Sequence, residues 1–101
     1  MPALPPSDAV DYARYAAFTR GFAVAYTPEF QTYEDTLVDI RRPKCKRTKP
    51  SQFRCEYRFT IESNDGWTLY DEHGRVRVTR HKHNHIVAKL FVTDTARLTR
   101  G

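Results

Sequence analysis

The stretch Phe53-Arg54-Cys55-Glu56-Tyr57-Arg58-Phe59-Thr60-Ile61-Glu62 decides the fold of this chain. Apolar and polar side chains alternate along it without interruption. Because successive side chains of a β-strand point to opposite faces of a sheet, the alternation predicts a strand with one buried face and one solvent-exposed face. Cys55 falls on the buried side of this strand, among aromatic side chains.

Turn signals downstream of this strand predict an antiparallel sheet. Asn64-Asp65-Gly66 is typical of a tight hairpin turn, and residues 67–70 are expected to return as the partner strand. We expect a weaker turn at Glu72-His73-Gly74 and a further strand over residues 75–87. Residues 88–101 fit either a last strand or a frayed tail.

Upstream of the sheet, the sequence predicts one helix from about residue 8 to residue 20. Ser7 or Asp8 is suited to cap its start, and a broad alanine-rich apolar face follows. Gly21 is expected to end the helix. Residues 22–26 alternate large and small side chains and are interpreted as a strand.

Two further segments precede the central strand. A second strand is expected over residues 33–41, and residues 42–52 are interpreted as a basic loop, because Pro43 and Pro50 exclude a regular central strand.

The chain is therefore predicted to have an α+β fold, in which one N-terminal helix packs on a four- to five-stranded antiparallel sheet. We expect a flexible leader over residues 1–7, one domain over residues 8–93 and a tail or linker over residues 94–101.

The positive charge of the chain is unevenly distributed. The net charge is +5, yet residues 1–40 carry two cationic side chains against six acidic ones, and residues 41–101 carry fifteen against six. A dense basic segment attracts polyanions, because binding releases their counterions. This charge favours a segment that binds nucleic acid over a loop that is charged only for solubility.

The apolar fraction of 40% excludes a disordered tail, and no apolar run is long enough to span a membrane.

Soft metal ligands cluster in two places. His81, His83 and His85 lie within five positions, and on an extended strand they would share one face. Cys45 and Cys55 bracket the basic segment and could complete a tetrahedral zinc site with two of these histidines. A disulfide between the cysteines, which would fit a secreted protein, is an alternative, and so is a pair of unlinked thiols.

The sequence gives little support for catalysis. The acidic residues are scattered, and no pair stands out as a general acid and base. The three clustered histidines could hold a catalytic zinc, but no general base accompanies them. We therefore expect that the protein is not an enzyme.

Several stretches resemble a known family. The run from Tyr12 to Tyr26 is similar to the opening of the far-red-impaired-response DNA-binding domain, in which a helix leads into a Gly-Phe-x-Val strand. Cys45, the strand that begins at Cys55-Glu56-Tyr57, then Gly66-Trp67-Thr68-Leu69 and His83-Asn84-His85 continue the resemblance in the same order. It covers roughly residues 9–87.

The resemblance implies membership of the WRKY–glial-cells-missing zinc-finger group, which occurs in transcription factors and Mutator-like transposases. It implies one structural Zn²⁺ at one end of the sheet, with Cys45, Cys55, His83 and His85 as ligands and His81 as a substitute. It also implies sequence-specific binding of double-stranded DNA through a strand edge, a role in transcription regulation and a nuclear location. The WRKY heptapeptide is absent and residues 22–26 carry no Lys or Arg, so base contacts do not transfer from WRKY proteins.

Candidate DNA contacts come from the basic segment and from nearby polar residues. Base reading is expected from polar side chains near Thr27 and Gln31, or from arginines of the basic segment. The alternative function is a zinc-stabilised interaction module that binds an acidic partner protein; a homodimer and further domains in a longer chain are both left open. The expected phosphate contacts are Arg41, Arg42, Lys44, Lys46, Arg47 and Lys49, with Arg80 and Lys82 as additions.

Overall fold

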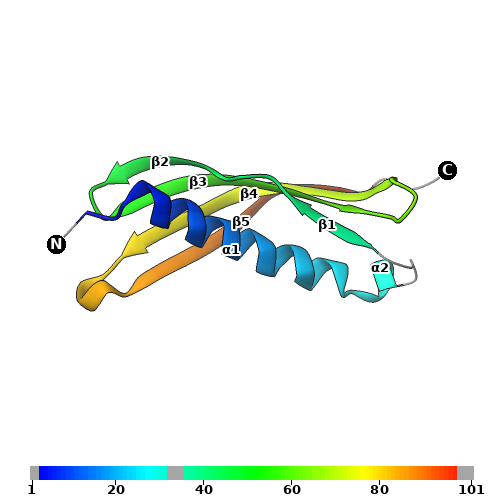
Figure 1. Cartoon of the computed structure of the whole chain (residues 1–101), viewed down its shortest axis with the longest axis horizontal. Coiled ribbons are helices and arrows are strands. Elements are labelled where there is room, and N and C mark those ends of the chain that lie inside the picture. Colours follow the sequence, from blue (N-terminus) through cyan, green and yellow to red (C-terminus); the bar gives the residue numbers. More distant parts are fainter. Residues whose placement is uncertain (1–2, 32–35, 98–101) are drawn as a thin grey trace.

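The protein is an α+β structure in which one long helix lies across one face of an antiparallel sheet (Figure 1). The computed structural model describes residues 3–31 and 36–97, without the side chain of Gln31. The predicted α+β class, with one N-terminal helix packed on an antiparallel sheet, is confirmed. The elements are α1 (Pro6–Ala25), α2 (Pro28–Gln31), β1 (Leu37–Ile40), β2 (Lys44–Lys49), β3 (Gln52–Glu62), β4 (Thr68–Arg80), the 3₁₀ turn η1 (Lys82–Asn84) and β5 (Ile86–Arg97).

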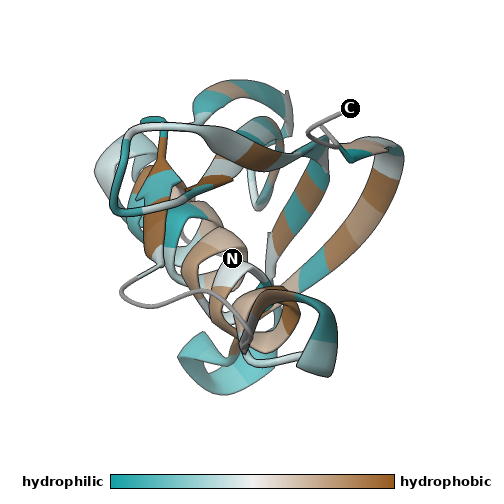
Figure 2. Ribbon diagram, turned by 90° about the vertical axis from the view of Figure 1, so that its right-hand side faces the viewer, coloured by the Kyte–Doolittle hydropathy of each residue, from teal (hydrophilic) through white to brown (hydrophobic). Residues whose placement is uncertain are grey.

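The long strands β3 and β4 form the centre of the sheet. The strand order is β1-β3-β4-β5, and β2 pairs with the same strand β3 as β1 does. All pairings are antiparallel. β1 occupies the second half of β3 and β2 its first half, with the buried Pro43 in the connection between them. The alternation that predicted β3 is realised, since hydrophobic and hydrophilic bands alternate along the strands (Figure 2).

Helix α1 packs on the sheet through small side chains. Ala9, Ala13, Ala17 and Gly21 follow each other at intervals of four residues and therefore share one face of the helix. The three alanines are fully buried. Small side chains let the helix backbone approach the sheet closely. Within the described residues, no helix combines the length and the apolarity needed to cross a membrane.

The expectation that Gly21 ends the helix and that residues 22–26 form a strand is wrong, because α1 continues to Ala25. Gly21 instead marks a point of close approach: a Cβ atom there would lie 2.7 Å from Cγ1 of Val38 and 3.5 Å from the ring of Phe59. Val24 and Ala25 follow Gly21 by three and four residues and are therefore buried on the same face of the helix.

Two further segments differ from expectation. The basic segment of residues 42–52 contains strand β2, which lies at the edge of the sheet, so that Pro43 and Pro50 flank it without interrupting a ladder. The expected turn at residues 72–74 lies inside β4. Gly74 is required there because a Cβ atom would lie 2.2 Å from the carbonyl oxygen of Phe91 and 2.7 Å from the ring of Tyr57.

The ends of the remaining predicted elements also shift. β1 spans only Leu37–Ile40, and residues 33–35 of the expected second strand lie outside the described residues. α1 begins at Pro6, within the expected leader. Residues 88–97 of the ambiguous segment belong to β5, which pairs with β4 up to Arg97, and residues 98–101 lie outside the described residues.

A buried carboxylate joins the helix to the sheet. The side chain of Glu72 is fully buried and accepts hydrogen bonds from Arg20 of α1, at 2.9 Å to Nη2 and 3.0 Å to Nε. The hydroxyl of Tyr57 donates a third bond at 2.8 Å and that of Tyr70 a fourth. Both carboxylate oxygens therefore have partners, which offsets the cost of removing the charge from water.

The pKa values in this network reflect burial and hydrogen bonding. Burial alone raises the pKa of Glu72, but the hydrogen bonds from Arg20, Tyr70 and Tyr57 outweigh burial and hold the pKa below its ordinary value. Burial and the bond to Glu72 raise the pKa of Tyr70 to about 12. The ionised form of Glu72 is thus favoured in the folded protein.

We predict that Glu72→Gln lowers the free energy of unfolding at neutral pH by roughly 2–4 kcal/mol, because it removes a paired buried charge. Since the pKa of Glu72 is lowered on folding, its contribution is present above the unfolded pKa of about 4.3 and lost as the pH falls through the folded pKa. The difference between wild type and variant should therefore narrow in acid. Urea unfolding at a series of pH values measures this.

The matched control is Glu56→Gln, which changes an exposed glutamate of β3 and should shift the free energy of unfolding by no more than about 0.5 kcal/mol. Equal losses in both variants, or a Glu72→Gln loss that persists unchanged at low pH, would contradict the assigned role of Glu72.

Candidate nucleic-acid interface

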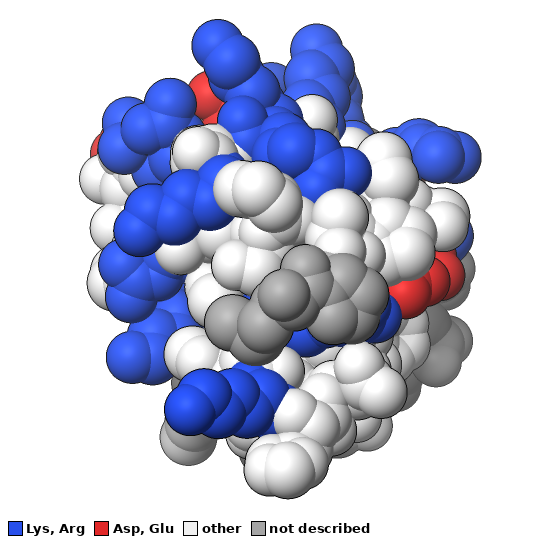
Figure 3. Space-filling view, turned by 90° about the vertical axis from the view of Figure 1, so that its left-hand side faces the viewer, with Lys and Arg blue, Asp and Glu red and all other residues white. Residues whose placement is uncertain are grey.

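The face of the sheet turned away from α1 carries the polar side chains that alternate with the core. On β3, Arg54, Glu56 and Arg58 are exposed, and on β4 the exposed side chains include Arg75 and Arg77. This surface is termed the outer face. It comprises the side chains of Lys44, Lys46, Arg54, Glu56, Arg58, His73, Arg75, Arg77, Lys89 and Phe91. Figure 3 shows Lys and Arg side chains gathered over the upper and left sides of one end of the molecule, with few acidic groups between them.

Four cations lie in register across the outer face. Lys46 of β2 is opposite Arg54 of β3, Arg54 is opposite Arg77 of β4, and Arg77 is opposite Lys89 of β5. These four residues are termed the basic row. Adjacent strands are about 4.8 Å apart, so the row spans about 14 Å from β2 to β5.

The basic row carries charge that no acidic side chain of the described residues neutralises. The ion pairs in this part of the chain involve Arg20, Arg58, Arg80 and Arg97 and none of the row. Like charges directly opposite one another on neighbouring strands destabilise a sheet. Because an anion placed over the row would relieve this repulsion, the row is a candidate binding surface for polyanions.

Two adjoining hollows flank the basic row on the outer face. The first has a volume of about 430 Å³ and is lined by the cations Arg41, Arg42, Lys44, Arg58 and Arg75, with Glu56 as its acidic side chain. The second, of about 640 Å³, is lined by Arg54, Arg75, Arg77 and Phe91 together with polar side chains. Arg75 and Thr93 line both hollows, so the two lie next to each other.

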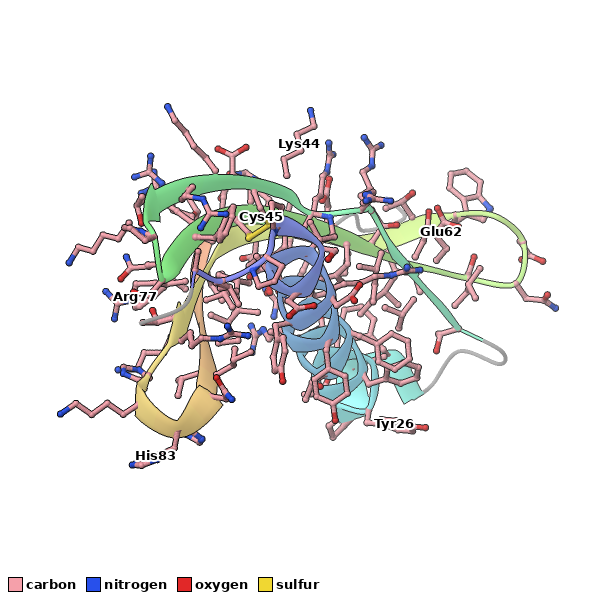
Figure 4. The ribbon with its side chains drawn as sticks, turned by 60° about the vertical axis from the view of Figure 1, so that its left-hand side comes forward. Tyr26, Lys44, Cys45, Glu62, Arg77 and His83 are labelled. Carbon is pink, nitrogen blue, oxygen red and sulfur yellow. A yellow bond between two sulfur atoms is a disulfide. The ribbon has the colours of Figure 1, made fainter. Side chains whose placement is uncertain are left out.

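Part of the predicted phosphate-binding set lies on this surface. Arg41 and Arg42 are exposed in the connection between β1 and β2 and line the first hollow, together with Lys44. Lys46 begins the basic row. Figure 4 shows Lys44 pointing away from the sheet, on the side opposite α1. The structure therefore brings these four predicted residues to one surface.

The other predicted contacts lie elsewhere. Arg47 is on the opposite side of β2, with its guanidinium 4.5 Å from the ring centroid of Phe53, and it donates a hydrogen bond to the carbonyl of Pro50. Lys49 is exposed at the end of β2. Arg80 is half-buried and contacts the carbonyl of Ala3 and the carboxylate of Asp8.

Lys82 is exposed in η1, at the tip of the β4–β5 hairpin. Thr27 lies between α1 and α2, where its hydroxyl donates to the carbonyl of Val24, at the far end of α1 from β2 (Figure 1). The side chain of Gln31 lies outside the described residues.

Sequence reasoning missed Arg54, Arg75, Arg77 and Lys89 as candidate contacts. The alternation of Arg75-Val76-Arg77-Val78 does place both arginines on the solvent side of a strand. The register that aligns Arg77 with Arg54, Lys46 and Lys89 depends on turn geometry and on strand bulges. The sequence therefore indicated that these arginines are exposed, but it did not indicate which cations align across the strands.

The histidine cluster forms a hairpin turn rather than an extended strand. His83 and Asn84 have φ angles of 63° and 60°, and the amide of His81 donates to the carbonyl of His85 at 2.6 Å. Two consecutive positive φ angles are typical of the tight turns that join antiparallel strands. The three histidines therefore do not share one strand face, and His83 lies at the tip of the hairpin (Figure 4).

The two cysteines are joined to each other. Cys45 and Cys55 form a disulfide between directly opposed positions of β2 and β3. Cys55 is opposite Val76 of β4. From Val76 the strand continues for about 13 Å to Arg80 before the histidine turn begins, so the turn lies well beyond the level of the cysteines. Among the described residues, no group of three or more His, Cys, Asp and Glu side chains is placed to hold a metal ion. The residues as arranged do not fit a four-ligand zinc site, and structural zinc stays a prediction of the resemblance.

The disulfide is the main apolar anchor of β2. Of the six residues of this strand, Cys45 alone is half-buried and packs against the core, and the other five are exposed. An edge strand with one buried side chain has little apolar burial to hold it in place. The disulfide therefore helps to fix Lys44 and Lys46 at the edge of the outer face.

Comparison of the chain with protein-family models, curated proteins and solved structures returns no match. The function is therefore argued from the residues of this chain.

We predict that thiol titration of the denatured, unreduced protein detects neither cysteine. Reduction should lower the free energy of unfolding by about 2–3 kcal/mol, because the disulfide closes a loop with a sequence separation of 10. Denaturant unfolding with and without dithiothreitol measures the effect, and a Cys45→Ala/Cys55→Ala variant should show no response to the reductant. Two free thiols together with one bound Zn²⁺ in native mass spectrometry would contradict the disulfide and support the zinc site.

Proposed function

We propose that the outer face binds the sugar–phosphate backbone and groove of double-stranded DNA. The observation that carries this proposal is the basic row, in which Lys46, Arg54, Arg77 and Lys89 stand in register without acidic partners in the described part of the chain. Each cation that approaches a phosphate releases a condensed counterion, and this release favours binding.

The dimensions of the row match those of duplex DNA. The row is about 14 Å long, and the major groove of B-DNA is about 12 Å wide. A row of this length reaches from one phosphate backbone across a groove to the other. The lysines at its two ends, Lys46 and Lys89, are proposed to contact phosphates.

The two arginines in the middle of the row are proposed to read bases. Arg54 and Arg77 are exposed on the central strands β3 and β4, where they face the floor of a bound groove. A guanidinium can donate two hydrogen bonds to O6 and N7 of guanine, so these positions favour guanine-containing sites. Sequence preference would then come from the centre of the row and affinity from its ends.

The wider setting implied by the resemblance is a separate part of the proposal. A role in a transcription factor or a transposase-derived regulator, a nuclear location and a structural zinc all follow from the resemblance and not from the outer face. DNA binding by the basic row requires none of them.

We predict that binding of a labelled duplex, measured by fluorescence anisotropy, weakens steeply with salt. Replacing Lys89 by Gln should reduce the slope of log K against log salt concentration by about 1, because one phosphate contact is lost. The fourfold variant Lys46→Gln/Arg54→Gln/Arg77→Gln/Lys89→Gln should reduce the slope by about 2, because both proposed phosphate contacts are lost, and should also remove the preference for guanine.

Arg14→Gln is the matched control, since Arg14 is an exposed arginine of α1 on the other side of the molecule. It should leave the slope unchanged. Equal effects of Arg14→Gln and Lys89→Gln on the slope would show that only net charge matters and would overturn the assignment to the outer face. Absence of duplex binding at low salt would favour the alternative, an acidic partner protein.

A further inference from the structure

An exposed aromatic ring lies among the cations of the outer face. Phe91 of β5 is 50% exposed and stands opposite Arg75 in the sheet register. The guanidinium of Arg77 lies 5.6 Å from its ring centroid. Proteins that bind single-stranded nucleic acid combine these two features, because bases stack on aromatic rings while cations hold the backbone.

The second hollow places this ring where a base can reach it. Phe91 lines the hollow together with Arg54, Arg75 and Arg77. The hollow has a volume of about 640 Å³, within the range of roughly 300–1,000 Å³ that small-ligand sites occupy. A nucleobase stacked on Phe91 would therefore have room beside the cations.

The first hollow provides the matching place for a phosphate. Of its cations, Arg58 is already engaged by Asp71, with contacts of 2.6 and 3.1 Å. Arg41, Arg42, Lys44 and Arg75 form no ion pair within the described residues. Glu56 is the acidic side chain that lines this hollow, so the cations outnumber it. The surplus positive charge is complementary to a phosphate group.

The backbone shapes both hollows. The pairing of β4 with β5 shifts between His73 and Gly74, which leaves Thr93 of β5 without a register partner. Thr93 lines both hollows, and Gly74, which has no side chain, lines the first. The strand bulge therefore contributes to the shape of both hollows, together with the exposed arginine side chains that line them.

We propose that the two hollows bind one unpaired nucleotide of single-stranded DNA. Its base stacks on Phe91, and its phosphate lies among Arg41, Arg42, Lys44 and Arg75. The inference rests on the proposed function, since it uses the same outer face. It goes further by assigning a stacking residue and a preference for unpaired strands. A base within a duplex is covered by its neighbours and would have to leave the stack to reach Phe91.

The test measures the affinity for a labelled oligothymidine and for a labelled duplex at one salt concentration. Phe91→Leu keeps an apolar side chain but removes the ring, and should weaken oligothymidine binding by roughly 5- to 150-fold. Phe91→Trp should retain the affinity. Phe91→Leu should weaken duplex binding much less than oligothymidine binding, because the bases of a duplex are already stacked on their neighbours.

Tyr15→Leu is the control, because Tyr15 is a 72% exposed aromatic residue of α1, outside the outer face. It should leave both affinities unchanged. Oligothymidine binding that is equally strong in wild type and Phe91→Leu overturns the inference, even where the duplex binds through the basic row. Oligothymidine binding that needs Phe91, in a protein that does not bind duplex, supports the inference and refutes the duplex proposal.

Discussion

The contact between Arg20 and Glu72 is the constraint on which the rest of the structure depends. It joins the C-terminal half of α1 to the N-terminal half of β4, and Tyr57 adds β3 to the same carboxylate. The helix is thereby fixed to one face of the sheet, where its small side chains allow close packing. The other face stays uncovered by any described element, and its alternate positions are free to carry charge. One-sided burial thus produces both the core and the proposed binding surface.

The fold could be predicted from the sequence as far as local patterns determine it. The alternation along β3 identified the core strand, and the α+β class followed from it together with the N-terminal helix. Two of the errors concern glycines. Gly21 and Gly74 resemble a helix end and a turn, but each is a point where another segment packs too closely for a Cβ atom. A close approach of this kind depends on tertiary packing, which a local sequence pattern does not contain.

The candidate site was predictable only in part for a related reason. The charge between Arg41 and Lys46 is visible in the sequence, and the structure places it on the outer face. The basic row joins residues 46, 54, 77 and 89, which only the strand register brings together. For the histidine cluster, closeness in sequence suggested that the side chains share one strand face. The cluster instead forms a hairpin turn, in which they do not share a face. The sequence offered a disulfide between the two cysteines only as an alternative to the Cys–His site, and the structure shows that disulfide.

The central claim is that the outer face, and not the helix, contacts nucleic acid. The most direct measurement is a nuclear magnetic resonance titration with a short DNA duplex at low salt, observing the Nε–Hε signals of the arginines. The account predicts shifts for Arg54 and Arg77, while Arg20, whose Nε already donates to Glu72, stays unchanged. Shifts at Arg14 of α1, with Arg54 and Arg77 unaffected, would contradict the account.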